Sequence, residues 1–282
     1  MAETTSLITI TTDFGEADYF VPAMKGVIYG INPAAKIVDL THLIPPHDVY
    51  AAAFTMMCCY EAFPINTIHL VVVDPGVGSA RRPIMVMTDD YNFIGPDNGV
   101  FSYIYQRAHV NRVVHFTTAH YFRQPVSNTF HGRDVFAPCA AYVSKLIDWK
   151  MMGEEINDPV RFNTPTPVVT SDKRIQGTVI HVDRFGNLIT NITGAELTEE
   201  RIRAGARVRI GKHEALRVLT HFTEANPNEL FGYFGSAGFL ELAVPRQSAA
   251  NVVEARRGFE VEVIVGEGSA EVDSNPKSGG SS

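Results

Sequence analysis

The order of apolar and polar positions divides the chain into two halves. In the first half, short runs rich in β-branched residues alternate with segments whose apolar residues recur at helical spacing. Runs of the first kind predict strands, and segments of the second kind predict amphipathic helices. Strands that alternate with helices indicate an α/β domain built on a parallel or mixed sheet. The predicted strands are 7–11, 36–40, 68–73, 85–88, 91–94 and 113–116, and the predicted helices are 21–31, 49–63 and 135–146.

The second half has a different pattern. Pro159, Pro165 and Pro167 predict an extended linker, because proline fixes its own backbone angle and lacks an amide hydrogen. Short alternating strands with turn residues between them and no long helix follow, which is typical of a small antiparallel β domain. These strands are predicted at 178–182, 207–210, 239–242 and 259–264. We therefore predict an α/β domain over 1–158, a linker over 159–170, a smaller β-barrel-like domain over 171–273 and a disordered tail over 274–282.

Composition narrows the class of protein. The 282 residues favour two domains, and 45% hydrophobic with 20% charged residues is typical of a soluble globular chain. A formal charge of −7 provides no basic surface, so no nucleic-acid partner is expected. The three cysteines, two of them adjacent, suit neither a disulfide framework nor a zinc site and favour a cytoplasmic protein. No segment has the length of a membrane span or the pattern of a signal peptide, so no membrane partner is expected.

The segment 68–83 carries the first candidate chemistry. Its apolar run, 68–73, predicts a strand buried on both faces, and Asp74-Pro75-Gly76 ends it. The carboxyl ends of such strands are where open α/β sheets place their ligands. Arg81 follows seven residues later, and a turn that folds back would aim its guanidinium at Asp74. The alternative is a Pro-Gly turn followed by a surface arginine pair.

Other polar clusters also follow predicted strands or precede predicted helices. Asp13 directly follows the strand 7–11 and could either cap the next helix or bond a ligand hydroxyl. His131 lies in a five-residue stretch that also contains an arginine and an aspartate, just before a helix. In the second domain, residues 183–187 could read the edge of a purine and stack on its face, or could form only an Asx turn around Gly186.

Several standard sites are missing from the sequence. It contains no P-loop, no dinucleotide fingerprint, no Gly-x-Ser-x-Gly elbow and no helical histidine pair for zinc. A metal site would have to use His42, His47, Asp74 and His131, whose spacing matches no standard pattern. What remains is Asp74, Arg81 and His131 in the first domain and a possible nucleoside-reading loop in the second.

Six motifs carry a resemblance to a known family. In order they are TTDFG, VVDPGVGSARR, GPDNGVF, TFHGRD, VDRFGNLITNI and SAGFLELAV. Together they resemble the S-adenosyl-L-methionine hydroxide adenosyltransferases, the adenosine-forming hydrolases related to fluorinase and chlorinase, over residues 8–253. The resemblance implies that a water-derived hydroxide attacks the ribose C5′ carbon of S-adenosyl-L-methionine. L-methionine then leaves and adenosine forms, with no cofactor and no metal.

The resemblance also implies roles for individual residues. The catalytic set is Asp74, Arg81 and His131. The substrate-binding residues form two groups, one before the linker and one after it. Before the linker, Asp13 matches the position that holds the ribose hydroxyls, His47 matches an aromatic wall of fluorinase, and Thr129 and Phe130 line the ribose and sulfonium region. After the linker, Asp183, Phe185 and Asn187 surround the substrate, Phe222 stacks on adenine and Ser236 lies at the methionine end.

Two alternatives to hydrolysis remain. A halogenase is disfavoured because the halogenating relatives carry a tyrosine, a threonine and a serine where this chain has Asp74, Val77 and Gly132. Their large insertion after the position of Arg82 is also missing. A nucleoside-binding protein without turnover would not require the Asp-Arg-His set. Pro245 departs from the hydrolases, which carry an asparagine there, so no contact is predicted from that turn.

The expected chemistry follows from the leaving group. A sulfonium departs as a neutral thioether, so the enzyme needs an activated oxygen behind C5′ and no acid. Arg81 is expected to favour the hydroxide, while Asp74 and His131 orient the water and take up its proton. A carboxylate paired with a guanidinium stays ionised. The resemblance further implies a homotrimer, with each site shared between the first domain of one chain and the second domain of its neighbour.

Overall fold

The computed structural model describes residues 7–171 and 173–266. The chain forms two compact units, Met1–Thr164 and Pro165–Ser282, and the division falls inside the predicted linker. Strand β8 (Val168–Ser171) begins in the last residues of that predicted linker and pairs with β9 (Arg174–Val182). The predicted tail, 274–282, lies outside the described residues.

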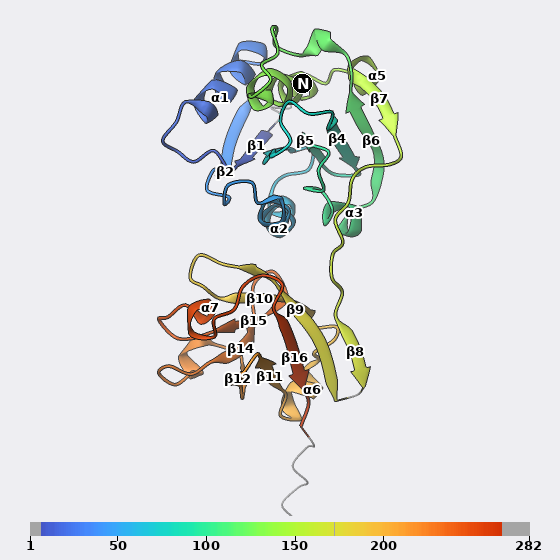
Figure 1. The fold of residues 1–282 in the computed structure, drawn as a ribbon. Coiled ribbons are helices and arrows are strands. Elements are labelled where there is room, and N and C mark those ends of the chain that lie inside the picture. The colour runs from blue at the N-terminus through green and yellow to red at the C-terminus, as the bar shows by residue number, and fades with distance from the viewer. Residues whose placement is uncertain (1–6, 172, 267–282) are drawn as a thin grey trace, which may run out of the picture. The chain divides into compact units, whose positions relative to one another are not determined.

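The first unit is an α/β domain, as predicted (Figure 1). Its described residues form a seven-stranded mixed sheet in the order β2-β1-β3-β5-β4-β6-β7. Strands β2, β1, β3 and β5 run parallel, and β4, β6 and β7 add antiparallel pairs. The strands are β1 (Leu7–Thr12), β2 (Lys36–Thr41), β3 (Ile68–Val72), β4 (Pro83–Thr88), β5 (Asn92–Pro96), β6 (Val110–Phe116) and β7 (Gly153–Ile156).

Burial on both faces explains why strand β3 is apolar apart from His69. Leu70 and Val72 pack into one hydrophobic core, with helices α1 (Phe20–Ile31) and α4 (Ala137–Ser144). Val71 and Val73 pack into a second core, with α2 (Val49–Cys59). Successive side chains of a strand point to opposite faces, so a strand covered on both faces is expected to be largely apolar. The helices are α1 (Phe20–Ile31), α2 (Val49–Cys59), α3 (Ile104–Arg107), α4 (Ala137–Ser144) and α5 (Trp149–Met152).

The second unit is a nearly closed, barrel-like β sheet, as predicted (Figure 1). In its described residues the strand order is β12-β11-β16-β9-β10-β15-β14-β13, with β8 paired to β9. Alternation is clearest in β11, whose Val208 and Ile210 are buried while Arg207 and Arg209 are exposed. The elements are β9 (Arg174–Val182), β10 (Leu188–Thr193), α6 (Glu199–Arg203), β11 (Arg207–Ile210), β12 (His213–Ala215), β13 (Val218–Leu219), β14 (Phe231–Phe234), β15 (Phe239–Ala243), α7 (Ala249–Val252) and β16 (Glu260–Ile264).

One predicted helix begins differently from expectation. Apolar spacing predicts a single helix over 135–146, but the structure has a π-helical turn at Gly132–Phe136 that leads into α4. The wider turn accommodates the densely packed segment around Gly132, and Pro138 in the first turn of α4 cannot donate a backbone hydrogen bond. Single π-helical turns are frequent at functional sites, and this one directly follows His131.

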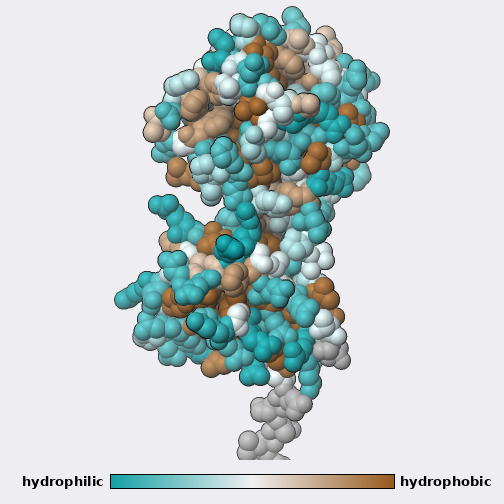
Figure 2. All heavy atoms as spheres, in the orientation of Figure 1, coloured by the Kyte–Doolittle hydropathy of each residue, from teal (hydrophilic) through white to brown (hydrophobic). Residues whose placement is uncertain are grey.

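On the face drawn in Figure 2, polar residues predominate, with apolar areas between them. Among the described residues, helices are too short or too polar to span a bilayer.

Candidate active site

The turn that follows β3 brings Arg81 back over Asp74. The Ser79 hydroxyl donates to the Gly76 carbonyl at 2.6 Å and accepts from the Arg81 amide at 3.2 Å, which closes the turn. Gly78 has φ +78°, and a Cβ atom there would collide with the carbonyl oxygen of Asn128. Glycine is therefore required where this turn passes the segment that leads to His131.

Asp74 and Arg81 form the ion pair that the sequence predicted. The Arg81 Nε donates to both carboxylate oxygens of Asp74 at 2.9 Å, and a terminal guanidinium nitrogen, Nη2, donates to Oδ2. The two side chains are only 9% and 5% exposed. The Arg81 guanidinium also lies 4.9 Å from the centre of the buried Phe136 ring, so its orientation is fixed from a second direction.

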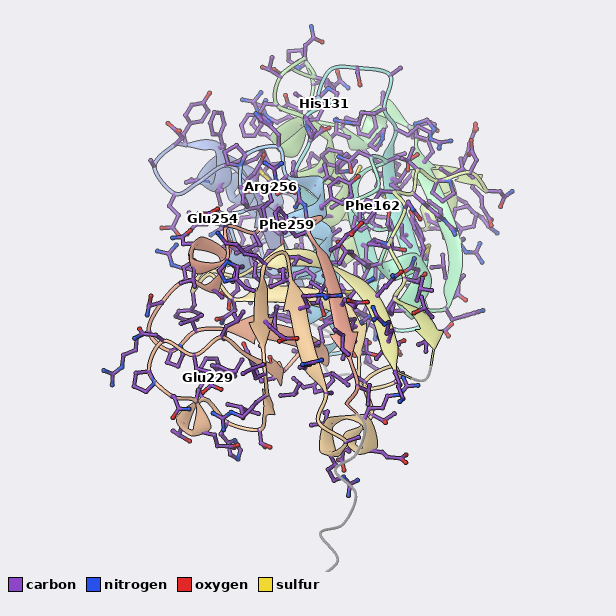
Figure 3. All side chains as sticks on the ribbon, turned by 60° about the horizontal axis from the view of Figure 1, so that its bottom comes forward. His131, Phe162, Glu229, Glu254, Arg256 and Phe259 are labelled. Carbon is purple, nitrogen blue, oxygen red and sulfur yellow. The ribbon has the colours of Figure 1, made fainter. Side chains whose placement is uncertain are left out.

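His131 completes the cluster, at the start of the turn that leads into α4 (Figure 3). Its Nδ1 lies 2.7 Å from Arg81 Nη2. A guanidinium can only donate, so Nδ1 is the acceptor, and the neutral ring carries its hydrogen on Nε2. Burial and the neighbouring Arg81 charge both lower the pKa of His131, which favours the same neutral form.

A buried carboxylate that sequence reasoning missed holds the segment before His131. Asp134 is fully buried and accepts hydrogen bonds from the Ser127 amide at 2.9 Å and from the guanidinium of Arg133 at 2.7 and 2.8 Å. Arg123 adds a longer contact of 3.2 Å. The sequence signal for this role was the motif TFHGRD, in which the aspartate directly follows an arginine. Such a pair, when buried, is expected to organise a loop.

Asp13 lies at the same edge of the sheet as Asp74. Strands β1 and β3 are parallel neighbours with Thr12 opposite Val72, so both aspartates follow the carboxyl ends of adjacent strands. Asp13 does not cap α1, whose first residue follows Tyr19 without a side-chain cap. Its Oδ2 instead accepts the backbone amide of His47 at 2.8 Å.

His47 is held in an unusual backbone conformation beside Asp13. Its φ is +66°, which is uncommon for a residue with a side chain, and its imidazole is 76% exposed. The hydrogen bond that the His47 amide donates to Asp13 stabilises this conformation and leaves the ring directed to the surface. The structure therefore brings these two predicted residues together.

The two predicted residues before His131 differ in their surroundings. Thr129 is exposed, and its amide and hydroxyl contact the Ser127 hydroxyl. Phe130 is buried, packs edge-on against Phe20 at 5.2 Å and lies under the Arg133 guanidinium at 5.0 Å. Phe130 thus contributes mainly to the core, and Thr129 presents polar atoms at the surface.

In the second unit, residues 183–187 form the Asx turn, which was one of the two interpretations of this loop. Asp183 Oδ1 accepts from the amides of Phe185 and Asn187 at 2.9 and 2.8 Å, and Oδ2 accepts from the Asn187 side chain at 2.9 Å. This Asx turn fixes the loop and leaves the Phe185 ring 79% exposed. A turn that anchors its own backbone and projects an aromatic ring is suited to stacking on a flat ligand.

A pocket of about 500 Å³ gathers three of the predicted residues, Phe185, Asn187 and Phe222. The Phe222 ring is 46% exposed and packs against Phe231 and Tyr233 at 5.2 and 4.8 Å. Ser236 lies outside this pocket, on the exposed turn between β14 and β15. A larger hollow, of about 990 Å³, lies along β9 and β16 and contains none of the predicted residues.

Sequence reasoning missed the other wall of this pocket. It is formed by the residues that follow β15: Val244, Arg246, Gln247 and Ser248. Pro245 had removed this turn from the predicted site, yet the chain still folds back here, with Arg246 at φ +61°. The available signal was Ser248, which caps α7 by accepting the Asn251 amide and thereby marks the end of a tight turn.

Comparisons with known proteins agree with this architecture. The models of the N- and C-terminal domains of the SAM hydroxide adenosyltransferases match residues 8–153 and 177–262. A curated relative from Methanocaldococcus jannaschii, named (R)-S-adenosyl-L-methionine hydrolase, is 35% identical over 269 residues, covering 92% of this chain and 95% of its own. A relative of the same name from Salinispora arenicola is 35% identical, covering 93% and 99%.

A more distant curated relative and one solved structure were also compared with this chain. A fluorinase from Nocardia brasiliensis is 24% identical, covering 92% of this chain and 97% of its own. The crystal structure of an uncharacterized conserved protein from Thermotoga maritima superposes with a TM-score of 0.85 at 35% identity, covering 91% and 99%. The class is thus that of two-domain enzymes with an α/β unit followed by a barrel-like unit. The chain belongs to the S-adenosyl-L-methionine hydroxide adenosyltransferase family, as its motifs predicted.

Proposed function

We propose that this enzyme hydrolyses S-adenosyl-L-methionine to adenosine and L-methionine. The observation that carries the proposal is the buried cluster of Asp74, Arg81 and His131 in a chain whose curated relatives are named (R)-S-adenosyl-L-methionine hydrolase. Because those names specify the (R) configuration, we include the preference for the (R) sulfonium epimer in the proposal.

The reaction requires little from the enzyme at the leaving group. The water oxygen attacks C5′ in line with the C5′–S bond, and the electron pair of that bond goes to sulfur, which leaves as the neutral thioether of methionine. The attacking oxygen loses one proton as it becomes the 5′ hydroxyl of adenosine. No acid is needed, whereas an acceptor for that proton is.

The three residues divide this work. Asp74 has unused lone pairs and accepts the water proton, which then passes to solvent. The neutral His131 donates from Nε2 and orients the water. Arg81 stabilises the negative charge that develops on the oxygen and fixes both neighbours through its bonds. Asp74 is assigned as the proton acceptor in preference to His131, because His131 Nδ1 already accepts a hydrogen bond from Arg81.

The surroundings of each predicted residue suggest which part of the substrate it contacts. Asp13 holds the ribose hydroxyls, with His47 and Thr129 beside the ribose and Phe130 supporting that wall from the core. Phe185, Asn187 and Phe222 hold adenine in the pocket of the second unit, with Asp183 fixing the loop, and Ser236 lies at the methionine end. We also propose a homotrimer in which the first unit of one chain and the second unit of its neighbour complete each site.

Isotope labelling tests the reaction directly. The enzyme is incubated with resolved (R)- and (S)-S-adenosyl-L-methionine in ¹⁸O-labelled water, with and without chloride or fluoride, and the products are identified by mass spectrometry. We expect one ¹⁸O atom in the 5′ hydroxyl of adenosine, unlabelled L-methionine and faster turnover of the (R) epimer. A 5′-halogenated adenosine would support the halogenase, and binding without any product would support a nucleoside-binding protein.

A further inference from the structure

Strand β1 carries two buried threonines, and each is bonded to a histidine from a neighbouring segment. The Thr9 hydroxyl lies 2.8 Å from His69 Nδ1, on β3, and the Thr12 hydroxyl lies 2.9 Å from His42 Nδ1, just after β2. All four side chains are buried. The two pairs are chemically alike, but only the second lies next to Asp13.

His42 contacts the chain on both sides of Asp13. Its Nδ1 reaches the hydroxyl of Thr12, and its carbonyl oxygen accepts the backbone amide of Gly15 at 2.8 Å. The same Thr12 hydroxyl accepts the amide of Phe14 at 3.2 Å. One residue therefore fixes the turn that presents the Asp13 carboxylate.

The Thr12 hydroxyl bonds two neighbours at once. Its oxygen accepts from the Phe14 amide, and the same hydroxyl bonds His42 Nδ1, with the direction of that second bond set by the imidazole tautomer. Asp39 Oδ1 lies 3.1 Å from His42 Nε2. Lys25 in turn bonds Asp39, so this carboxylate faces the ring while paired with a cation.

The Asp13 carboxylate has one oxygen in use. Its side chain is 8% exposed, and Oδ2 accepts the His47 amide. Among the hydrogen bonds within residues 7–171 and 173–266, the Asp13 side chain accepts through Oδ2 and not through Oδ1. A mostly buried carboxylate with one open oxygen is a precise acceptor for a hydroxyl only if its backbone cannot shift.

We propose that His42 is a positioning residue that sets the Asp13 carboxylate for the ribose hydroxyls of the substrate. The inference rests on the proposed function, because that function gives Asp13 its partner. It adds a residue whose side chain acts through Thr12 and whose removal affects recognition of the ribose and no other part of the ligand.

The test compares two nucleosides and needs no turnover. Binding of adenosine and of 2′,3′-dideoxyadenosine to the full-length protein is measured by calorimetry for His42→Gln and His42→Asn. The asparagine amide can still reach Thr12, whereas the glutamine amide extends past it toward Asp39. We expect His42→Gln to weaken adenosine binding about tenfold, the effect of misplacing one hydrogen bond to a charged group, and to leave the dideoxy ligand unchanged. His42→Asn should retain most of the affinity.

The pair Thr9–His69 supplies a matched control. His69→Gln removes an equally buried threonine–histidine bond from the same strand, and we expect it to lower the melting temperature without weakening adenosine binding. Thr12→Val and Thr9→Val repeat the comparison from the other partner, in case a histidine variant does not fold. Asp13→Asn combined with His42→Gln should bind adenosine no more weakly than Asp13→Asn alone.

Each other outcome has a meaning. The positioning role is overturned if His42→Gln weakens the binding of both nucleosides equally. It is also overturned if His69→Gln weakens adenosine binding as much as His42→Gln does. Either result leaves the proposed hydrolysis intact. A wild-type protein that binds both nucleosides equally removes the role of Asp13, and with it that of His42. A wild-type protein that discriminates between them but releases no adenosine from S-adenosyl-L-methionine contradicts the hydrolysis alone.

Discussion

At the scale of single residues, one guanidinium determines the chemical state of its neighbours. Arg81 has donors and no acceptor, so the two groups it bonds, Asp74 and His131 Nδ1, must both be acceptors. The carboxylate is then ionised and the imidazole neutral. A cluster with these states can take a proton from water but cannot give one to a leaving group, which matches the needs of a sulfonium substrate.

Asp74→Asn and His131→Ala are expected to lower kcat about 10²- to 10⁴-fold, the range for loss of a proton acceptor or of a group that orients the nucleophile. The Kd for the substrate should change little, because these groups act on the reacting water. Single-turnover rates and equilibrium binding measured on each variant separate the two quantities. A variant that retains near-wild-type turnover would show that its residue has no part in the chemistry.

The pH dependence follows from the direction of the His131 shift. Its pKa lies below the ordinary 6.5, and the active form is the neutral one. The ratio kcat/KM should therefore fall on the acid side, as protonation of His131 displaces the Arg81 bond, with the midpoint of that fall below pH 6.5. A pH–rate profile checks this. An acid limb centred above pH 6.5 would mean that His131 is not the group responsible.

At the scale of elements, the sequence predicted the parts that follow from periodicity. The apolar run of β3 had to lie between two cores, and the alternation of β11 had to line a barrel. The Asp74–Arg81 pair was predictable because a Pro-Gly turn reverses the chain within seven residues. The bond from Asp13 to His47 was not, because it depends on a positive φ at His47, which local pattern does not reveal. Nor was the π-helical turn after His131, whose cause is packing around Gly132.

Gly78, in the turn after β3, allows a test of how closely this turn packs against Asn128. Gly78→Ala should destabilise the protein by about 2–4 kcal/mol, because it adds both positive-φ strain and a collision with the Asn128 carbonyl. Gly205→Ala is the control, since Gly205 also has a positive φ but has open space around its Cα, and only about 1 kcal/mol of strain is expected there. Chemical denaturation measures both. Equal effects would show that the turn can move away from Asn128.

At the scale of the whole molecule, the proposed chemistry uses side chains alone. Activity should therefore survive exhaustive treatment with EDTA, because the substrate carries its own positive charge and its leaving group needs no Lewis acid. Turnover is compared before chelation, after chelation and after each of several divalent ions is added back. Loss of activity that one ion restores would require a metal in the mechanism and would remove Arg81 as the main source of positive charge.

The division of proposed site residues between the two units leads to the last prediction. Asp74 lies in the first unit and Asn187 in the second, and a head-to-tail ring can join such halves between chains. Asp74→Ala and Asn187→Ala chains are each expected to be inactive. In a ring with shared sites, an equal mixture after co-refolding should recover about one quarter of the wild-type activity, because one interface in four joins two intact halves.

The control mixture combines Asp74→Ala with His131→Ala chains. Both substitutions lie in the first unit, so no interface of that mixture joins intact halves, and it should stay inactive. Native mass spectrometry establishes that mixed trimers have formed in both samples. Mixed trimers of the Asp74→Ala and Asn187→Ala chains that remain inactive would place each site within a single chain, and the ring would then have no part in building it.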